Sequence, residues 1–273
     1  MSADPAVPSE PAVKQCCARL YESDFARLLL GDSFHPGGVK LTEHLGGLLE
    51  LRPESRVLDV ASGPGTSAIF LAERFGCEVI GVDYSAANVA RANAQAAERG
   101  LTRVRFLEGD AERLPVEDIS FGAASFDAVV CECAFCTVPD KPAAAREFAR
   151  ALRAGGRVGL SDLTRSGPLP AELETLLAWI ACIANAQPLD AYAAWLTDSG
   201  LRIDRTERRD EALAEMVNRA GMRLLGAETM MGLGRLQLPG VDLTEAKSLA
   251  RAARAAVTQG RLGYGLVIAT KVS

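Results

Sequence analysis

Apolar and polar positions along the chain fall into short apolar runs, each followed by a longer segment with helical spacing. Apolar runs of strand length indicate buried strands, and apolar residues three or four positions apart indicate helices that cover them. The runs expected to form strands are residues 56–61, 78–83, 104–110, 126–133, 157–163, 202–209 and 264–271. Because strands and helices alternate, the pattern predicts an α/β fold: a doubly wound, mostly parallel sheet of seven strands with helices on both faces.

A single domain is expected to contain this sheet, since 273 residues suffice for one large α/β core. Residues 1–12 are rich in Pro, Ser and Ala, so we expect a disordered lead-in before that domain. The domain, residues 13–273, is expected to consist of a helical cap at 13–52, a core at 53–163 and a C-terminal part with the last strands at 164–273. Helical spacing across residues 13–30 predicts one helix at the start of the cap.

The charge pattern and the apolar content limit the partners of the chain. The formal net charge is −5 and the charged residues are interspersed, which argues against duplex nucleic acid as a main partner. The start of the sequence has no basic segment followed by an apolar stretch, and no later stretch stays apolar long enough to cross a bilayer. We therefore expect a cytoplasmic location, with neither nucleic acid nor membrane as partner.

The composition includes seven cysteines, which are Cys16, Cys17, Cys77, Cys131, Cys133, Cys136 and Cys182. An odd number in a chain expected in the cytoplasm argues against a disulfide framework. Cys77 precedes an apolar run and is interpreted as a small buried core residue. Cys131, Cys133 and Cys136 lie within six residues at the end of an expected strand, which core packing explains less well. Alternation along a strand would direct Cys131 and Cys133 to the same face.

A glycine turn follows the first expected strand, in the segment from Asp59 to Gly65. Ligands of open α/β sheets bind beyond the carboxyl ends of the strands, where small residues and a helix N-terminus admit a close approach. Gly63, Gly65 and Ala68 also fit the dinucleotide pattern G-x-G-x-x-A. Asp83 follows at about the ~20-residue distance of that fingerprint. A nicotinamide-dependent oxidoreductase is therefore one interpretation of this turn.

Further features favour a different cofactor. Asp59 lies inside the end of the first strand, where a dinucleotide-binding strand usually runs apolar into its first glycine. The segment from Gly109 to Pro115 reads G-D-A-x-x-L-P at the end of the third strand. Together with the acid Asp83 that ends the second strand, these motifs resemble those of the class I S-adenosylmethionine-dependent methyltransferases. The resemblance implies a Rossmann-like fold, S-adenosylmethionine as cofactor in the core at 53–163, and methyl transfer as the activity.

The resemblance also implies which residues bind the cofactor. The turn at Gly63 and Gly65 would contact its amino-acid part, with Asp59 nearby, although this turn has an alanine where the usual pattern has a further glycine. Asp83 would accept hydrogen bonds from both ribose hydroxyls, and Asp110 would accept one from the adenine amino group. The complete set implied is Asp59, Ala61, Gly63, Gly65, Asp83, Tyr84, Asp110, Ala111 and Cys131.

The cysteines extend the resemblance to the arsenite methyltransferase family. In that family a cysteine stands shortly before V-P-D-K, and Cys133 has this position relative to residues 138–141. A second substrate thiol follows the fifth strand, a position that Cys182 occupies here. The resemblance therefore implies a metalloid substrate, trivalent arsenic, held by Cys133 and Cys182. Soft trivalent arsenic selects thiolate ligands, and its lone pair carries no proton, so the transfer would need no general base.

The adjacent pair Cys16 and Cys17 departs from this family, whose N-terminal section usually contains further cysteines. Neighbouring residues of a helix point about 100° apart, so the two thiols are not expected to bind one ion together. One of them is a candidate third ligand or resolving thiol, and helix packing is the alternative. The arsenic chemistry would also require a thiol reductant as partner.

Other functions are compatible with the same motifs. The methyl acceptor could be a small organic carbon, oxygen or sulfur nucleophile, and methylation would then survive the loss of the Cys133 thiol. Alternatively, the chain could bind S-adenosylmethionine or a thiophilic metal as a regulator without turnover.

Overall fold

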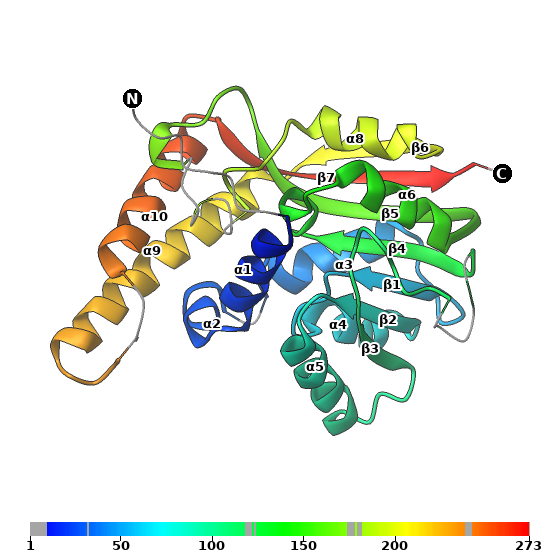
Figure 1. The fold of residues 1–273 in the computed structure, drawn as a ribbon, viewed down its shortest axis with the longest axis horizontal. Coiled ribbons are helices and arrows are strands. Elements are labelled where there is room, and N and C mark those ends of the chain that lie inside the picture. The colour runs from blue at the N-terminus through cyan, green and yellow to red at the C-terminus, as the bar shows by residue number, and fades with distance from the viewer. Residues whose placement is uncertain are drawn as a thin grey trace.

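The computed structural model describes residues 10–31, 33–117, 122, 124–173, 178, 182–237 and 242–272. Within these residues, seven strands form one sheet in the order β3-β2-β1-β4-β5-β7-β6 (Figure 1). The strands are β1 (Arg56–Val60), β2 (Glu78–Asp83), β3 (Val104–Glu108), β4 (Phe126–Glu132), β5 (Leu152–Arg165), β6 (Leu201–Arg208) and β7 (Leu262–Lys271). Strands β1 to β5 pair in parallel, and β7 runs antiparallel to both β5 and β6. The predicted Rossmann-like, mostly parallel α/β sheet is confirmed.

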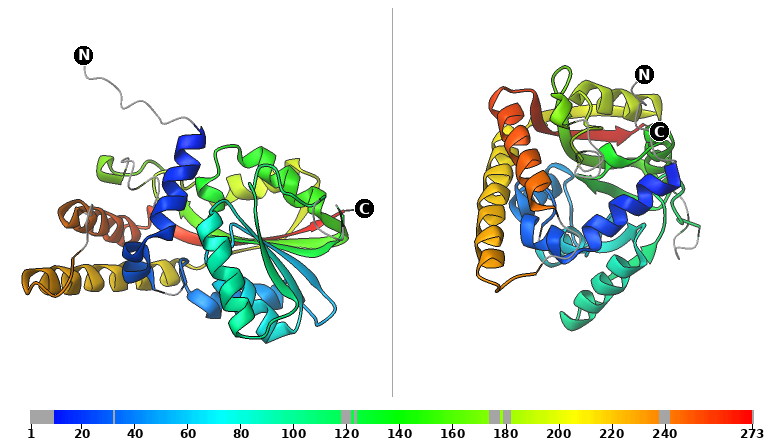
Figure 2. Two further views of the ribbon diagram at one scale, coloured as in Figure 1. Left: turned by 60° about the horizontal axis from the view of Figure 1, so that its bottom comes forward. Right: turned by 60° about the vertical axis from the view of Figure 1, so that its left-hand side comes forward.

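Helices lie on both sides of the sheet (Figure 2). They are α1 (Glu10–Glu22), α2 (Asp24–Leu30), α3 (Gly38–Leu48), α4 (Thr66–Phe75), α5 (Ala86–Glu98), α6 (Lys141–Ala151), α8 (Leu189–Asp198), α9 (Asp210–Gly232) and α10 (Leu243–Thr258). Helices α9 and α10 pack along each other and form an arm that extends beyond the sheet (Figure 1). In the described part of the chain, no helix has the length and apolarity to cross a membrane.

The N-terminal cap differs from its prediction in two respects. Helix α1 begins at Glu10, inside the predicted lead-in, while residues 1–9 lie outside the described part of the chain. The single helix predicted over residues 13–30 is instead two helices that meet at Ser23. The Ser23 hydroxyl accepts a hydrogen bond from the Ala26 N–H at 3.1 Å and so caps α2. The apolar spacing continues across this break, so hydrophobic periodicity alone predicted one helix instead of two.

The ring of Phe106 connects the sheet to the turn after β1. Gly81 of β2 lies against this ring, and a Cβ atom at Gly81 would overlap it. Gly65, the residue before α4, has a φ of +89°, and a Cβ atom there would lie 2.7 Å from the same ring. Both glycines are therefore required by the buried ring, and Gly65 also by a backbone conformation that favours glycine.

We expect Gly81→Ala to lower the free energy of unfolding by about 1–3 kcal/mol, because the added methyl group overpacks the Phe106 ring. Gly226→Ala is the control, since Gly226 lies within α9 and an added carbon there would meet no atom within 4 Å. That variant should instead gain about 0.5–1 kcal/mol from helix propensity. Urea unfolding measures both changes, and equal effects of the two substitutions would contradict this packing.

Candidate functional site

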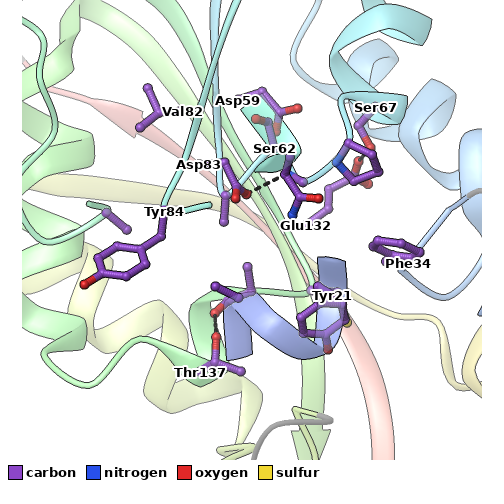
Figure 3. Close-up of a pocket in the computed structure, with 18 of the residues that line it drawn as sticks. Tyr21, Phe34, Asp59, Ser62, Ser67, Val82, Asp83, Tyr84, Glu132 and Thr137 are labelled. Atoms are coloured by element: carbon purple, nitrogen blue, oxygen red, sulfur yellow. Dashed lines mark hydrogen bonds between the residues drawn. The ribbon is translucent and has the colours of Figure 1, made fainter. Parts of the chain in front are cut away.

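A cavity of about 170 Å³ opens at the carboxyl ends of β1, β2 and β4, and we call it the first cavity. The strand ends and their loops contribute Asp59, Gly63, Asp83, Asp110 and Glu132 to its wall. Figure 3 shows Asp59, Asp83 and Glu132 grouped around it, with Tyr21 of α1 to one side. Because open α/β sheets bind ligands at this edge, the first cavity is the candidate ligand site.

The carboxylate of Asp83 fixes the glycine turn. Its two oxygens accept hydrogen bonds from the Gly63 N–H at 2.7 Å and the Ser85 N–H at 2.9 Å. Burial raises the pKa of Asp83 above its usual value, and these hydrogen bonds oppose that rise. In the same turn Ala61 has a φ of +58°, a left-handed conformation that costs a non-glycine residue roughly 1–2 kcal/mol. The alanine found where a glycine is usual is thus accommodated with backbone strain.

The other end of the first cavity is formed by Tyr84, Asp110 and Ala111. Asp110 accepts a hydrogen bond from the Glu112 N–H at 3.0 Å. It also forms an ion pair with Lys14 of α1 at 2.7 Å. Burial lowers the pKa of Lys14, but its hydrogen bonds to Asp110 and Glu112 outweigh burial and raise the pKa overall. These charged contacts hold α1 over the cavity.

Buried polar atoms without a partner gather in the wall of the first cavity. They are Asp59 Oδ2, Ser62 Oγ, Asn88 Oδ1 and Glu132 Oε1, which have no hydrogen-bond partner among the residues that the structure describes. Leaving a buried polar atom unpaired costs free energy, so such groups usually have a partner. A bound polar molecule with several hydrogen-bond donors would supply one. The cavity therefore fits a ligand such as S-adenosylmethionine, whose amino-acid and ribose parts carry donors of this kind.

The electrostatics of the first cavity favour a cation. Burial, followed by the negative charges of Glu132 and Asp83, raises the pKa of Asp59 well above its usual range. Asp59, Asp83 and Glu132 all face the same small volume. A positively charged ligand would relieve this repulsion and lower the pKa of Asp59 again.

The thiols of Cys133 and Cys182 meet beside the first cavity. Cys133 follows the last residue of β4 and lines the cavity, and Cys182 is buried behind it. The Cys182 Sγ lies 3.3 Å from the Cys133 carbonyl oxygen and 3.4 Å from the hydroxyl oxygen of Tyr21. The structure thus brings together the two thiols that the sequence selected, although 49 positions separate them in the chain.

Both of these cysteines have left-handed backbone conformations, with φ of +55° at Cys133 and +66° at Cys182. Such conformations are uncommon for residues other than glycine and persist only where the surrounding structure enforces them. Backbone strain of this kind concentrates at functional sites. Its presence at both thiols favours a functional role over simple core packing.

Cys136 is a third thiol of the same group, and the sequence analysis gave it no role. The pKa of Cys182 is lowered well below the usual thiol value, because Cys133, then Cys136, and also Tyr21 donate hydrogen bonds to its sulfur. The pKa of Cys133 is raised, mainly by its hydrogen bond to Cys182, and the pKa of Cys136 is raised mainly by burial. Of these three thiols, Cys182 is the one whose pKa is lowered, so these contacts favour it as the thiolate. The C-x-x-C spacing of Cys133 and Cys136 was the sequence signal for this third thiol.

Asp162 and Lys141 flank the thiols from β5 and α6. Asp162 accepts a hydrogen bond from the Cys136 N–H at 2.8 Å. Burial, followed by the negative charge of Cys182, raises the pKa of Asp162 to about 7. The Lys141 ammonium donates to the Val138 carbonyl oxygen at 2.9 Å, and its positive charge helps to lower the pKa of Cys182. Neither residue was recognised as part of the thiol site from the sequence.

A second cavity of about 140 Å³ adjoins the first, and its wall is almost entirely apolar. Side chains of α2, α9 and α10 form most of this wall, among them Val217 and Leu249. Tyr21, Phe34 and Cys133 line both cavities. Cys133 therefore lies where the two cavities adjoin.

The predicted cofactor residues divide into two groups. The residues that line the first cavity are Asp59, Ala61, Gly63, Asp83, Tyr84, Asp110 and Ala111. Gly65 lies outside its wall, and its glycine is required by the packing of Phe106 instead. Cys131 is only 1% exposed inside β4 and borders neither of the two cavities, so its contact with a cofactor remains a prediction.

Of the two thiols predicted on α1, the structure describes only that of Cys16. Cys16 is a free, partly exposed cysteine that borders neither cavity, and the Cys17 side chain lies outside what the structure describes. Their roles as third ligand or resolving thiol remain predictions. Among the described residues, no group of three or more His, Cys, Asp or Glu side chains is arranged to hold a metal ion.

Comparison with known proteins relates the fold and the motifs to methyl transfer. A family model described as a methyltransferase domain matches residues 57–156. The chain is 32% identical over 238 residues to the 27-O-demethylrifamycin SV methyltransferase of Amycolatopsis mediterranei, covering 85% of this chain and 83% of that protein. It is 29% identical over 165 residues to the arsenite methyltransferase of Halobacterium salinarum, covering 59% of this chain and 41% of that protein.

Solved structures share the fold. Phosphoethanolamine N-methyltransferase 2 of Haemonchus contortus, in complex with phosphomonomethylethanolamine and S-adenosylhomocysteine, superimposes with a TM-score of 0.79 at 19% identity. The superposition covers 99% of this chain and 62% of that one.

We expect the ultraviolet absorbance of thiolate to titrate well below the usual thiol pKa of about 8.5, and to lose this early component in Cys182→Ser. Tyr21→Phe should move the early component to higher pH, because the Cys182 thiolate loses one hydrogen-bond donor. Cys77→Ser is the control, since burial raises the pKa of Cys77 to about 11. An early component that persists unchanged in Cys182→Ser would assign the thiolate to another cysteine.

Proposed function

Because this chain belongs to the class I S-adenosylmethionine-dependent methyltransferases, we propose that it methylates trivalent arsenic, as arsenite or methylarsenite, held by Cys133 and Cys182. The observation that carries this proposal is the group of thiols that includes Cys133, which lines both cavities. Arsenic is the kind of acceptor that such a group would select, since soft trivalent ions prefer thiolate ligands. The similarity to the arsenite methyltransferase of Halobacterium salinarum supports the same substrate.

The cofactor, S-adenosylmethionine, fits the first cavity through the residues in its wall. We assign the Gly63 turn to its amino-acid part and Asp83 to its ribose hydroxyls, because a carboxylate accepts from two hydroxyl donors. Asp110 and the Ala111 backbone are assigned to the adenine ring, with Tyr84 beside them. When bound, the cofactor supplies an electrophilic methyl group on a sulfonium, and the sulfur keeps the electron pair of the broken bond.

The protein's own contribution would be to hold the acceptor. Cys182 ionises first and binds arsenic, and Cys133 follows as the second ligand. Each new arsenic–sulfur bond would replace an arsenic–hydroxyl bond, and the hydroxyl would leave as water with the proton of the thiol. Two thiolates leave the arsenic lone pair free, so no side chain has to remove a proton. Formation of an arsenic–carbon bond by this lone pair oxidises arsenic from the trivalent to the pentavalent state. A thiol reductant would return the two electrons before another transfer.

An organic acceptor is the second candidate, and the second cavity favours it. Its wall of apolar side chains suits the hydrocarbon part of a small molecule, and it adjoins the first cavity through Tyr21, Phe34 and Cys133. The relative from Amycolatopsis mediterranei carries the name of a methyltransferase of such a molecule, demethylrifamycin. In this case Cys133 would contribute to the shape of the pocket rather than bind the acceptor.

The two candidates differ in their dependence on the thiols. With methyl-labelled S-adenosylmethionine, arsenite and excess thiol, we expect labelled methylarsenic from the wild type and an activity at least about 100-fold lower in Cys133→Ser and Cys182→Ser. Cys77→Ser should retain activity, because Cys77 lies in the core and its thiol donates to the Leu71 carbonyl oxygen. Cofactor binding measured by calorimetry should be similar in all four proteins.

Two results would count against arsenic as the acceptor. Absence of labelled arsenic from a wild type that binds the cofactor would exclude it directly. Labelling of an organic acceptor that persists in Cys133→Ser would favour the second candidate.

A further inference from the structure

Glu132 is a buried acid at the end of β4 whose role the motifs do not explain. Its side chain is only 3% exposed and lines the first cavity. One carboxylate oxygen, Oε2, accepts hydrogen bonds from the hydroxyls of Thr42 at 2.9 Å and Ser67 at 2.7 Å. His35 Nε2 lies 3.7 Å from the same oxygen. Helix α3, helix α4 and the loop before α3 thus all fix this one side chain.

The other oxygen of Glu132, Oε1, is buried without a hydrogen-bond partner in the described structure. Asp59 repeats this arrangement, since it accepts a hydrogen bond from the Ala68 N–H while its Oδ2 has no partner. The two acids come from adjacent parallel strands, because Asp59 pairs with Val130, two residues before Glu132. Two unsatisfied carboxylate oxygens therefore border one cavity.

A cation with N–H donors suits these two oxygens, because both belong to buried acids that face one cavity. Lys14, a cation that lines the same cavity, is engaged by Asp110 and Glu112. An ammonium group carries three donors and a full positive charge, so it can satisfy two carboxylate oxygens at once. A sulfonium has the charge but no N–H donor. The amino-acid end of S-adenosylmethionine contains an ammonium group.

We propose that Glu132, together with Asp59, binds the α-ammonium group of S-adenosylmethionine, and that Thr42 and Ser67 position Glu132 for this contact. This role is independent of the methyl acceptor and holds for either candidate substrate. Burial and then the negative charge of Glu132 raise the pKa of Asp59, and a cation bound between the two acids would lower it again.

Glu132→Gln tests this role through binding rather than activity. We expect the dissociation constant of S-adenosylmethionine to rise at least about 10-fold, because a charge-assisted hydrogen bond is lost. S-adenosylhomocysteine keeps the ammonium group but lacks the sulfonium charge, and its dissociation constant should rise by the same factor. Methylthioadenosine, which lacks the whole amino-acid part, should bind as it does to the wild type. Calorimetry with these three ligands gives all the values.

The stability of the empty protein provides a second readout. Glu132→Gln should leave the Tm of the cofactor-free protein unchanged or raise it, while the Tm increase caused by S-adenosylmethionine becomes smaller. Ser67→Ala and Thr42→Val should weaken the binding of S-adenosylmethionine and of S-adenosylhomocysteine to a lesser degree. The binding of methylthioadenosine should not change. Glu43→Gln is the matched control on α3, since Glu43 pairs with Arg74 at the surface, and it should bind all three ligands as the wild type does.

Each of the following outcomes would contradict the proposal. Unchanged binding of S-adenosylmethionine to Glu132→Gln would exclude the contact. Weakening of S-adenosylmethionine without weakening of S-adenosylhomocysteine would assign Glu132 to the sulfonium. Equal weakening of methylthioadenosine, or a fall in the Tm of the empty protein, would reduce Glu132 to a structural role.

Discussion

The parallel pairing of β1 with β2 and with β4 gathers Asp59, Asp83 and Glu132 at one edge of the sheet, and the rest of the site depends on this accumulation of buried negative charge. Burial and mutual repulsion both disfavour three carboxylates in a small volume. The fold offsets part of this cost with backbone amides at Asp83 and Asp59 and with hydroxyls at Glu132. The oxygens without a partner in the described structure favour a ligand that has a positive charge and hydrogen-bond donors.

The three thiols of Cys133, Cys136 and Cys182 lie beside these acids, and their hydrogen bonds favour a negative charge on one sulfur. Hydrogen bonds from Cys133, Cys136 and Tyr21 converge on the sulfur of Cys182 and favour its thiolate form. Helix α1 connects the two regions, since Lys14 pairs with Asp110 on the cofactor side while Tyr21 contacts Cys182 on the thiol side. A change in the position of α1 would therefore alter cofactor binding and thiol ionisation together. The left-handed backbone at both Cys133 and Cys182 indicates that the surrounding packing holds the thiols in place against local preference.

The position of Cys133 also separates two kinds of space. On one side lies the first cavity with its buried acids, and on the other the apolar second cavity, formed largely by α2, α9 and α10. The related methyltransferases carry names of very different acceptors, from arsenite to demethylrifamycin. This is the expected behaviour of a fold in which the strand ends bind a constant cofactor and the surrounding helices shape a variable acceptor site. In this chain, helices α2, α9 and α10 form most of the wall of the second cavity, which Cys133 also lines.

The sequence by itself determined the sheet and predicted the cofactor edge, because strand–helix alternation and the motifs at Asp59, Asp83 and Asp110 are local in the chain. It also selected Cys133 and Cys182, although only through a resemblance. Periodicity assumes a continuous extended strand and so placed Cys131 and Cys133 on one face. The strand instead ends at Glu132, and the left-handed turn at Cys133 brings that thiol to the cavity wall while Cys131 stays in the core. The support of Glu132 by Thr42 and Ser67, the hydrogen bonds among the three thiols and the packing of Gly65 against Phe106 were decided only by the tertiary structure, because each joins residues from separate elements whose contact no local pattern records.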